Sequence, residues 1–213
     1  MILVGEGEDQ EPPDEFLKKS VSDTVLNLLG DYRYLTKGYY VSLHAEENNC
    51  IVFPSVKNAL DVYRAPIFME RLKKAGIDIP NFRVLKKPEP KSCVLVPLNP
   101  FSRNSAKLVK TENQYLKRFK SLSMGYRYSV VNVEVEGDIG EFEIYLGEAK
   151  KEEFEDLAEK TFEIFGVPIG KVLFEKVDDK IRPFYFMPLT TDEIDFAFLK
   201  EVINENWMLC RNL

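Results

Sequence analysis

The first 55 positions alternate short apolar runs with a longer mixed segment, a pattern that predicts a β-α-β unit. Residues 1–5, 25–29 and 50–53 are apolar runs of strand length, and each is followed or closed by glycine or proline. Residues 38–48 have the length and periodicity of a helix, and a shorter helix is expected at 14–19, after two prolines. The unit is expected to have parallel strands.

The rest of the chain changes from alternating units toward antiparallel strands and packed helices. The expected strands are residues 82–85, 93–96, 128–135, 141–146, 172–175 and 181–186, with Asp178 and Asp179 near the turn of a hairpin between the last two. The expected helices are "APIFMERLKKAG" (65–76), a segment capped by Thr111 and running through Lys120, and residues 152–165 and 192–207; Ser55 is a further cap. Gly137 and Gly140 are expected in the turn between the strands at 128–135 and 141–146.

These patterns indicate a mixed α/β (α+β) fold, with a β-α-β N-terminal part and an antiparallel C-terminal part. At 213 residues, one hydrophobic core can serve the chain. We expect a single domain over residues 1–213, with a division into two packed lobes, 1–98 and 99–213, left open. The helix at 38–48 carries tyrosines and aliphatic residues around nearly its whole circumference, so we expect it to be covered on several sides.

Charge and cysteine content narrow the function classes. A net charge of −6 disfavours non-specific nucleic-acid binding, and apolar residues interrupt the basic stretch from Lys107 to Lys120, as in a solvated helix face. Cys50, Cys93 and Cys210 are far apart and are expected to be buried thiols. No signal-peptide pattern or membrane-spanning apolar run occurs in the sequence, so a cytoplasmic location is expected.

The sequence gives little support to catalysis by a histidine, to a transition-metal site or to a phosphate-binding loop. His44, the only histidine, is interpreted as packed beside Tyr40 rather than as a general base. One histidine and three distant cysteines do not supply the compact ligand set of a transition-metal site. A magnesium site made of carboxylates alone remains an alternative. No phosphate-loop motif is present, and the acidic "GEGED" near the start is interpreted as a turn.

The loop 31–37 is the first candidate for ligand binding. It joins the end of a parallel strand to a helix N-terminus, where open α/β sheets bind ligands and unpaired N–H groups favour anions. The candidate residues are Tyr32, Arg33, Tyr34, Lys37, Tyr39 and Tyr40. A carboxylate or phosphate is the expected ligand. The structural alternative, equally favoured, has half-buried tyrosines and Arg33 paired with Asp31 or Glu46.

Two further segments are candidates for the same cleft. "NPFSRNS" follows a strand and supplies Asn99, Arg103, Asn104 and Ser105, although a polar capped loop would look the same. "YRY" at 32–34 recurs at 126–128, which adds Tyr126, Arg127 and Tyr128. The repeated triplet is treated as a coincidence unless the two copies are neighbours in space.

The stretch "VLNLLGDYRYLTKGYYVSLHAEENNCIVFPSV" resembles the defining region of the RimK-like ATP-grasp N-terminal domain family. The resemblance continues through "NPFSRNS", "SLSMGYRY", "FEIYLG" and "FEIFGVPIGKVLFE", in the family's order and over most of the chain. His44 stands where the family more commonly has an apolar residue.

The resemblance implies an α/β domain usually fused upstream of an ATP-grasp ligase, an enzyme class that joins a carboxylate to an amine. We expect this length to be used up by the N-terminal domain, so no cofactor and no metal are expected, and a separate ATP-grasp ligase is the expected partner. The expected ligand is an amino-acid or peptide-like carboxylate. Two alternatives remain: an independent enzyme acting on a small amino-acid or nucleotide-like ligand, and a structural assembly subunit.

Overall fold

A computed structural model describes residues 1–99 and 106–206 and has the expected mixed α/β fold. Its strands form a parallel sheet in the order β1-β2-β3, a sheet in the order β10-β9-β8, and an antiparallel sheet in the order β4-β7-β5-β6. Within the described ranges, no helix is both long enough and apolar enough to cross a membrane.

Contacts divide the chain into two compact units, each assembled from separate segments. The first unit comprises Met1–Val62, Phe142–Lys171 and Pro188–Leu213, and the second comprises Tyr63–Glu141 and Val172–Met187. The junctions of these units do not coincide with a break between residues 98 and 99. The single-domain organisation stays a prediction.

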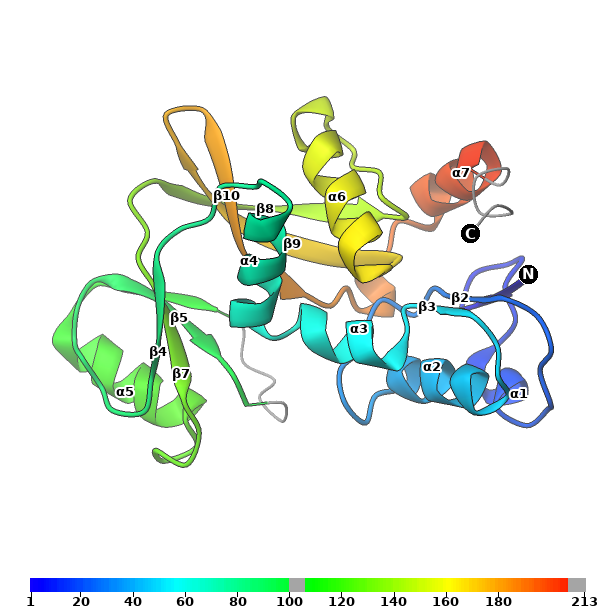
Figure 1. The fold of residues 1–213 in the computed structure, drawn as a ribbon, viewed down its shortest axis with the longest axis horizontal. Coiled ribbons are helices and arrows are strands. Elements are labelled where there is room, and N and C mark those ends of the chain that lie inside the picture. The colour runs from blue at the N-terminus through cyan, green and yellow to red at the C-terminus, as the bar shows by residue number, and fades with distance from the viewer. Residues whose placement is uncertain (100–105, 207–213) are drawn as a thin grey trace. The chain divides into compact units, whose positions relative to one another are not determined.

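The predicted β-α-β unit is confirmed at the start of the first unit (Figure 1). Strand β2 (Val25–Asn27) pairs in parallel with β1 (Ile2–Val4) on one side and β3 (Val52–Phe53) on the other. The short helix α1 (Pro13–Phe16) follows β1, and α2 (Lys37–Glu47) connects β2 to β3. The carboxyl ends of β1 and β2 therefore lie at the same edge of the sheet.

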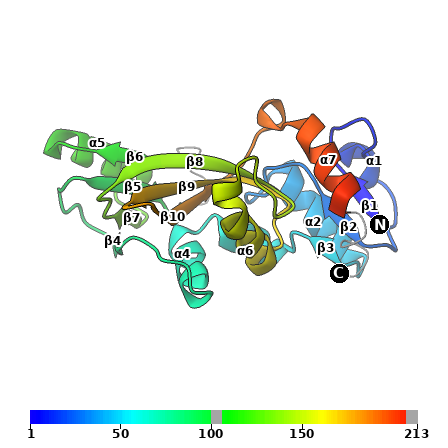
Figure 2. The same ribbon diagram turned by 90° about the horizontal axis from the view of Figure 1, so that it is seen from above.

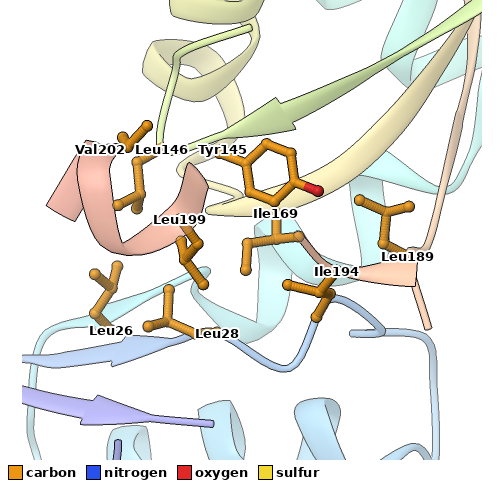
Figure 3. Packing of buried hydrophobic residues seen from close by; sticks show 9 residues of the cluster. All are labelled: Leu26, Leu28, Tyr145, Leu146, Ile169, Leu189, Ile194, Leu199 and Val202. Carbon is orange, nitrogen blue, oxygen red and sulfur yellow. The ribbon is translucent and has the colours of Figure 1, made fainter. Parts of the chain in front are cut away.

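Strand β2 and its extension are buried on both faces. Val25 and Leu29 belong to a cluster with residues of α1 and α2, whereas Leu26 and Leu28 belong to a second cluster. Figure 3 shows this second cluster, which draws Leu199 and Val202 from α7 (Phe196–Asn206) together with residues near the end of β8 and the start of β9. A strand buried on both faces explains the nearly continuous apolar run.

Helix α2 contacts α1, α3 and the strands β2 and β3, as expected for a helix that is covered on several sides, but one side of it stays open. Its buried residues are Gly38, Val41, Ser42 and Ala45, a single stripe at helical spacing, while Tyr40 is exposed. The rings of Tyr34 and Tyr39 contact each other, and so do those of Tyr39 and Tyr40. The remaining helices of the first unit are α3 (Val56–Val62), preceded by its expected cap Ser55, and α6 (Glu155–Phe165).

In the antiparallel sheet of the second unit, a strand that comes later in the sequence lies between two strands that come earlier. β7 (Val130–Val133) pairs with both β4 (Phe82–Leu85) and β5 (Cys93–Pro97), so β4 and β5 are not adjacent. β6 (Lys107–Val109), which the sequence analysis did not predict, pairs with β5. The amphipathic helix α5 (Glu112–Leu122), capped by Thr111 as expected, packs on β5 and β6 (Figure 1).

The hairpin predicted around Asp178 and Asp179 is confirmed. Both residues have positive φ, 45° and 64°, and they form the two-residue connection between β9 (Ile169–Val177) and β10 (Lys180–Met187). Figure 2 shows β9 and β10 beside β8 (Asp138–Tyr145). Helix α4 (Ala65–Lys74) packs on β10.

Gly140 was expected in a turn but lies within β8. A Cβ atom at Gly140 would stand 2.5 Å from the ring of Phe174, so glycine at this position makes room for that ring. β7 and β8 belong to different sheets, and the segment between them is not a hairpin turn.

A buried ion pair holds the second unit together. The Glu175 side chain is fully buried and lies 3.2 Å from an Nη1 atom of Arg182, which is 14% exposed. The other carboxylate oxygen accepts hydrogen bonds from the backbone N–H groups of Glu136 and Gly137 at 2.7 and 3.3 Å. The pair therefore ties the β9–β10 hairpin to the segment that enters β8.

Arg182→Ala should lower the free energy of unfolding by about 3–5 kcal/mol, because it leaves the Glu175 carboxylate buried without its cation. Urea denaturation measures the change. Lys180→Ala, at an exposed position of the same strand, is the matched control and should change stability little. Equal midpoints for the two variants would contradict a structural role for the pair.

Burial raises the pKa of the Cys93 thiol to about 11, so the reactive thiolate is scarce near neutrality. In the native protein at pH 8, Cys93 should react with a disulfide reagent more slowly than the half-buried Cys50, and it should react rapidly once the chain is unfolded in urea. Mass spectrometry of labelled peptides distinguishes the two cysteines. Equal labelling of both in the native state would contradict the burial of Cys93. Cys210 lies outside the described residues.

Candidate functional site

The loop from β2 to α2 is built by buried polar contacts at the end of β2. The Asn27 side-chain amide donates to the backbone oxygen of Gly38 at 2.7 Å and to Ser42 Oγ at 3.0 Å. Thr36 caps α2 by accepting from the backbone N–H of Tyr39 at 3.3 Å. These contacts fix the start of α2 beside the carboxyl end of the sheet.

Gly38 allows the loop to fold back onto its helix. A Cβ atom at this position would stand 2.3 Å from the backbone oxygen of Asp31. The close approach brings Asp31 and the residues after it against the first turn of α2, so the loop has one compact path.

Tyr32 supports this loop from inside. Its side chain is fully buried, and its hydroxyl donates to the backbone oxygen of Asn27 at 2.9 Å. Burial raises the pKa of the phenol well above its usual range, so the hydroxyl keeps its proton. The observed bond serves the fold, and ligand binding by Tyr32 stays a prediction.

Three other tyrosines form an aromatic surface, called here the tyrosine cluster: Tyr34, Tyr39 and Tyr40. The ring centroids of Tyr34 and Tyr39 are 5.3 Å apart, and those of Tyr39 and Tyr40 are 5.5 Å apart, both with edge-to-face geometry. Tyr34 is 42% exposed and Tyr40 is 44% exposed, while Tyr39 is half-buried between them. The cluster offers ring faces to an apolar or aromatic ligand group.

The two cations of the loop are both paired with carboxylates. Arg33 donates through Nε and Nη2 to the two oxygens of Asp31, at 2.8 and 2.6 Å. The Lys37 ammonium lies 3.2 Å from the Asp14 carboxylate, and both of these side chains are exposed. The pairing of Arg33 with Asp31 is the structural alternative considered from the sequence. The positive field at the loop is therefore weaker than that of two isolated cations.

His44 contacts the segment around α1 through a hydrogen bond and an aromatic ring. Its Nε2 lies 2.9 Å from the backbone oxygen of Lys19, and because a carbonyl only accepts, Nε2 carries the proton of this bond. The imidazole also meets the Phe16 ring edge to face at 5.4 Å. These contacts join α2 to the segment after α1.

The second candidate segment is described only in part. Asn99 is buried after β5, whereas Arg103, Asn104 and Ser105 lie outside the described residues. Tyr126 is half-exposed, Arg127 is exposed and Tyr128 is partly buried, and all three precede β7.

The antiparallel register pairs Pro97 with Val130, so the segments that carry Asn99 and Tyr128 lie at the same end of the antiparallel sheet. The structure thus brings these two predicted segments together within the second unit. A cleft shared with the loop after β2, which belongs to the first unit, stays a prediction.

A cavity at the neighbouring strand end was missed from the sequence. It has a volume of about 770 Å³ and lies between the loop after β1 and one face of α7. The acidic "GEGED" segment supplies part of its wall, although the sequence favoured a simple turn there. The residues of α7 lie nearly 190 positions further along the chain, so no local pattern could reveal the pairing.

Comparisons with known proteins identify the fold. A family model, the RimK-like ATPgrasp N-terminal domain, matches residues 13–200 of the chain. No curated protein matches the sequence.

Several solved structures resemble the chain at low sequence identity. The RimK domain ATP-grasp protein from Sphaerobacter thermophilus is 14% identical with a TM-score of 0.60, over 84% of this chain and 75% of that chain. The D-alanine–D-alanine ligase from Bacillus anthracis, complexed with ATP, is 14% identical with a TM-score of 0.59, over 94% and 84%. The ATP-grasp ligase PsnB, complexed with a minimal precursor, is 14% identical with a TM-score of 0.52, over 79% and 70%. These likenesses show an ATP-grasp-like fold.

Gly38→Ala should destabilise the first unit by about 1–3 kcal/mol, because the added methyl group collides with the Asp31 carbonyl and displaces the loop. Urea denaturation gives the loss. Lys37→Ala, at the adjacent exposed helical position, is the control and should change stability by less than about 0.5 kcal/mol. A Gly38→Ala variant as stable as the parent chain would contradict the close approach.

Proposed function

Because the chain belongs to the RimK-like ATP-grasp N-terminal domain family, we propose that it is a non-catalytic accessory domain for carboxylate–amine ligation. In this proposal, the chain binds an amino-acid or peptide-like carboxylate in the cytoplasm. A separate ATP-grasp ligase then forms the peptide-like bond in trans. The names of the structural relatives support the reaction class, since two are ligases and one of these was solved with a precursor.

The observation that carries the proposal is the tyrosine cluster at the carboxyl edge of a parallel sheet, beside Lys37 and the start of α2. Ligands of open α/β sheets bind outside this edge. Tyrosine rings supply apolar contact, and their hydroxyls supply hydrogen bonds at little conformational cost. The surface therefore suits a small ligand with a carboxylate and an apolar or aromatic side chain.

Lys37 is the cation that a ligand carboxylate engages in this proposal. Its ion pair with Asp14 is exposed on both sides, and such pairs contribute only about 0–1 kcal/mol. Exchanging Asp14 for a ligand carboxylate therefore costs little. Arg33, held by two hydrogen bonds to Asp31, keeps the loop in place during the exchange.

A second candidate function is an ATP-dependent enzyme in its own right. The likeness to the D-alanine–D-alanine ligase extends over 84% of that enzyme, so it is not confined to an N-terminal portion. This observation favours a chain that binds a nucleotide as well as a substrate. The accessory and enzymatic proposals differ in whether the isolated chain turns over ATP.

The binding proposal is tested by calorimetric titration of amino acids and dipeptides into the parent chain and variants. Lys37→Ala should weaken binding of a carboxylate ligand about tenfold, equivalent to about 1.4 kcal/mol, since the ligand loses its cation. Lys57→Ala, which removes an exposed lysine from α3, is the matched control and should bind like the parent. Equal affinities for the two variants, or no carboxylate binding, would overturn the proposal.

Partner and turnover are tested separately. Affinity purification of the tagged chain from its own cells should recover an ATP-grasp ligase, and the purified chain alone should release no phosphate from ATP with amino acids present. Phosphate release by the chain alone would instead establish the enzymatic candidate. Recovery only of copies of this chain, without ligand binding, would favour a structural assembly subunit.

A further inference from the structure

The cavity between the β1 loop and α7 has the size of a small-molecule site. Its volume of about 770 Å³ is within the range of ligand pockets, roughly 300–1,000 Å³. It opens where β1 ends, at the carboxyl edge of the parallel sheet, the usual ligand-binding edge of such sheets. All of its lining residues belong to the first unit.

The loop wall of the cavity is held in one shape. Gln10 accepts from the backbone N–H of Gly7 at 2.9 Å, and its own N–H donates to the Gly7 oxygen at 3.2 Å. A Cβ atom at Gly5 would stand 1.9 Å from Oε1 of Gln10, so glycine at this position makes room for the folded side chain. The wall is therefore preformed.

The helical wall is anchored from behind. Leu199 and Val202 of α7 are buried in the cluster with Leu26 and Leu28 (Figure 3), while Ala197, Lys200 and other residues of α7 line the cavity. Asp195 caps α7 by accepting from the backbone N–H of Phe198 at 3.1 Å. Figure 2 shows α7 on the same side of the unit as β1 and α1.

The chemistry of the lining combines an apolar surface with a negative rim. Leu3, Phe196 and Ile203 provide the apolar surface. Three acidic residues, Glu6, Glu8 and Asp9, line the cavity together with one basic residue, Lys200.

Lys200 already lies 2.7 Å from Asp9, a contact that raises the pKa of its ammonium. Asp9 therefore neutralises Lys200, and Glu6 and Glu8 leave the rim with excess negative charge. Such a rim attracts cations and repels anions.

We propose that this cavity binds a small aliphatic primary amine. The ammonium group lies at the carboxylates of Glu6 and Glu8, and the alkyl part packs on Leu3, Phe196 and Ile203. The inference rests on the proposed role in carboxylate–amine ligation and names the site of the second reactant. A carboxylate at the tyrosine cluster and an amine in this cavity would then occupy the loops that follow two adjacent parallel strands.

The probe is n-pentylamine, compared with pentan-1-ol and pentanoate, which keep the alkyl chain and change only the charge. Calorimetry or NMR titration of the whole chain at low salt and pH 7.5 should show the order amine, alcohol, pentanoate in falling affinity. Added salt should weaken the binding of n-pentylamine and leave the binding of pentan-1-ol unchanged, because only the amine carries a charge.

Two variants locate the site. The double variant Glu6→Gln, Glu8→Gln should weaken n-pentylamine about tenfold and leave pentan-1-ol unaffected. Its matched control removes two exposed carboxylates of α6, Glu159→Gln with Glu163→Gln, and should bind like the parent. Ala197→Trp should fill the cavity and abolish binding of both probes, with an unchanged circular dichroism spectrum showing that the chain is folded.

The outcomes separate this inference from the proposed function. Absence of amine binding, equal affinity for amine and alcohol, or unchanged binding in Ala197→Trp would overturn the amine site, whatever Lys37→Ala does. Amine binding in a chain that binds no carboxylate and recovers no ligase would overturn the proposed function and leave the site standing.

Discussion

Burial of both faces of β2 is the constraint on which the first unit depends. Val25 and Leu29 pack toward α1 and α2, and Leu26 and Leu28 pack toward α7 and the end of β8. The buried side-chain amide of Asn27, between these residues, donates hydrogen bonds to Gly38 and Ser42 of α2. Strand β2 thereby positions both the loop that carries the tyrosines and helix α7, which forms one wall of the cavity. Both candidate sites therefore depend on the packing of β2.

Charge is organised differently at the two sites. At the tyrosine cluster, Arg33 and Lys37 each face an aspartate, which leaves aromatic surface and one weakly held lysine as the means of recognition. The cavity is lined by three acidic residues and one lysine. The loop after β2 thus suits an anion with an apolar side chain, and the loop after β1 suits a cation. These are the charges that the two reactants of amide formation carry near neutral pH.

Local signals predicted the elements with good accuracy. The strand Phe82–Leu85, the cap at Thr111 and the turn at Asp178 and Asp179 depend on neighbours within a few residues, so they could be found from periodicity and turn chemistry. Tyr32 could not be assigned this way, because its neighbours Asp31 and Arg33 are charged and only partly buried while the ring itself is fully buried. A tyrosine suits either environment, and only packing distinguishes them.

Hydrophobic periodicity, turn residues and motif order along the chain were enough to predict the mixed α/β class, the β-α-β start and the resemblance to the RimK-like family. Only the tertiary structure shows that β7 separates β4 from β5, that Lys37 pairs with Asp14, and that α7 forms a cavity with the β1 loop. Each of these joins residues distant in sequence. Strand order, long-range ion pairs and cavities depend on how the helices and strands pack against one another. The hydrophobic pattern of the sequence shows only which face of each element is apolar and will be buried.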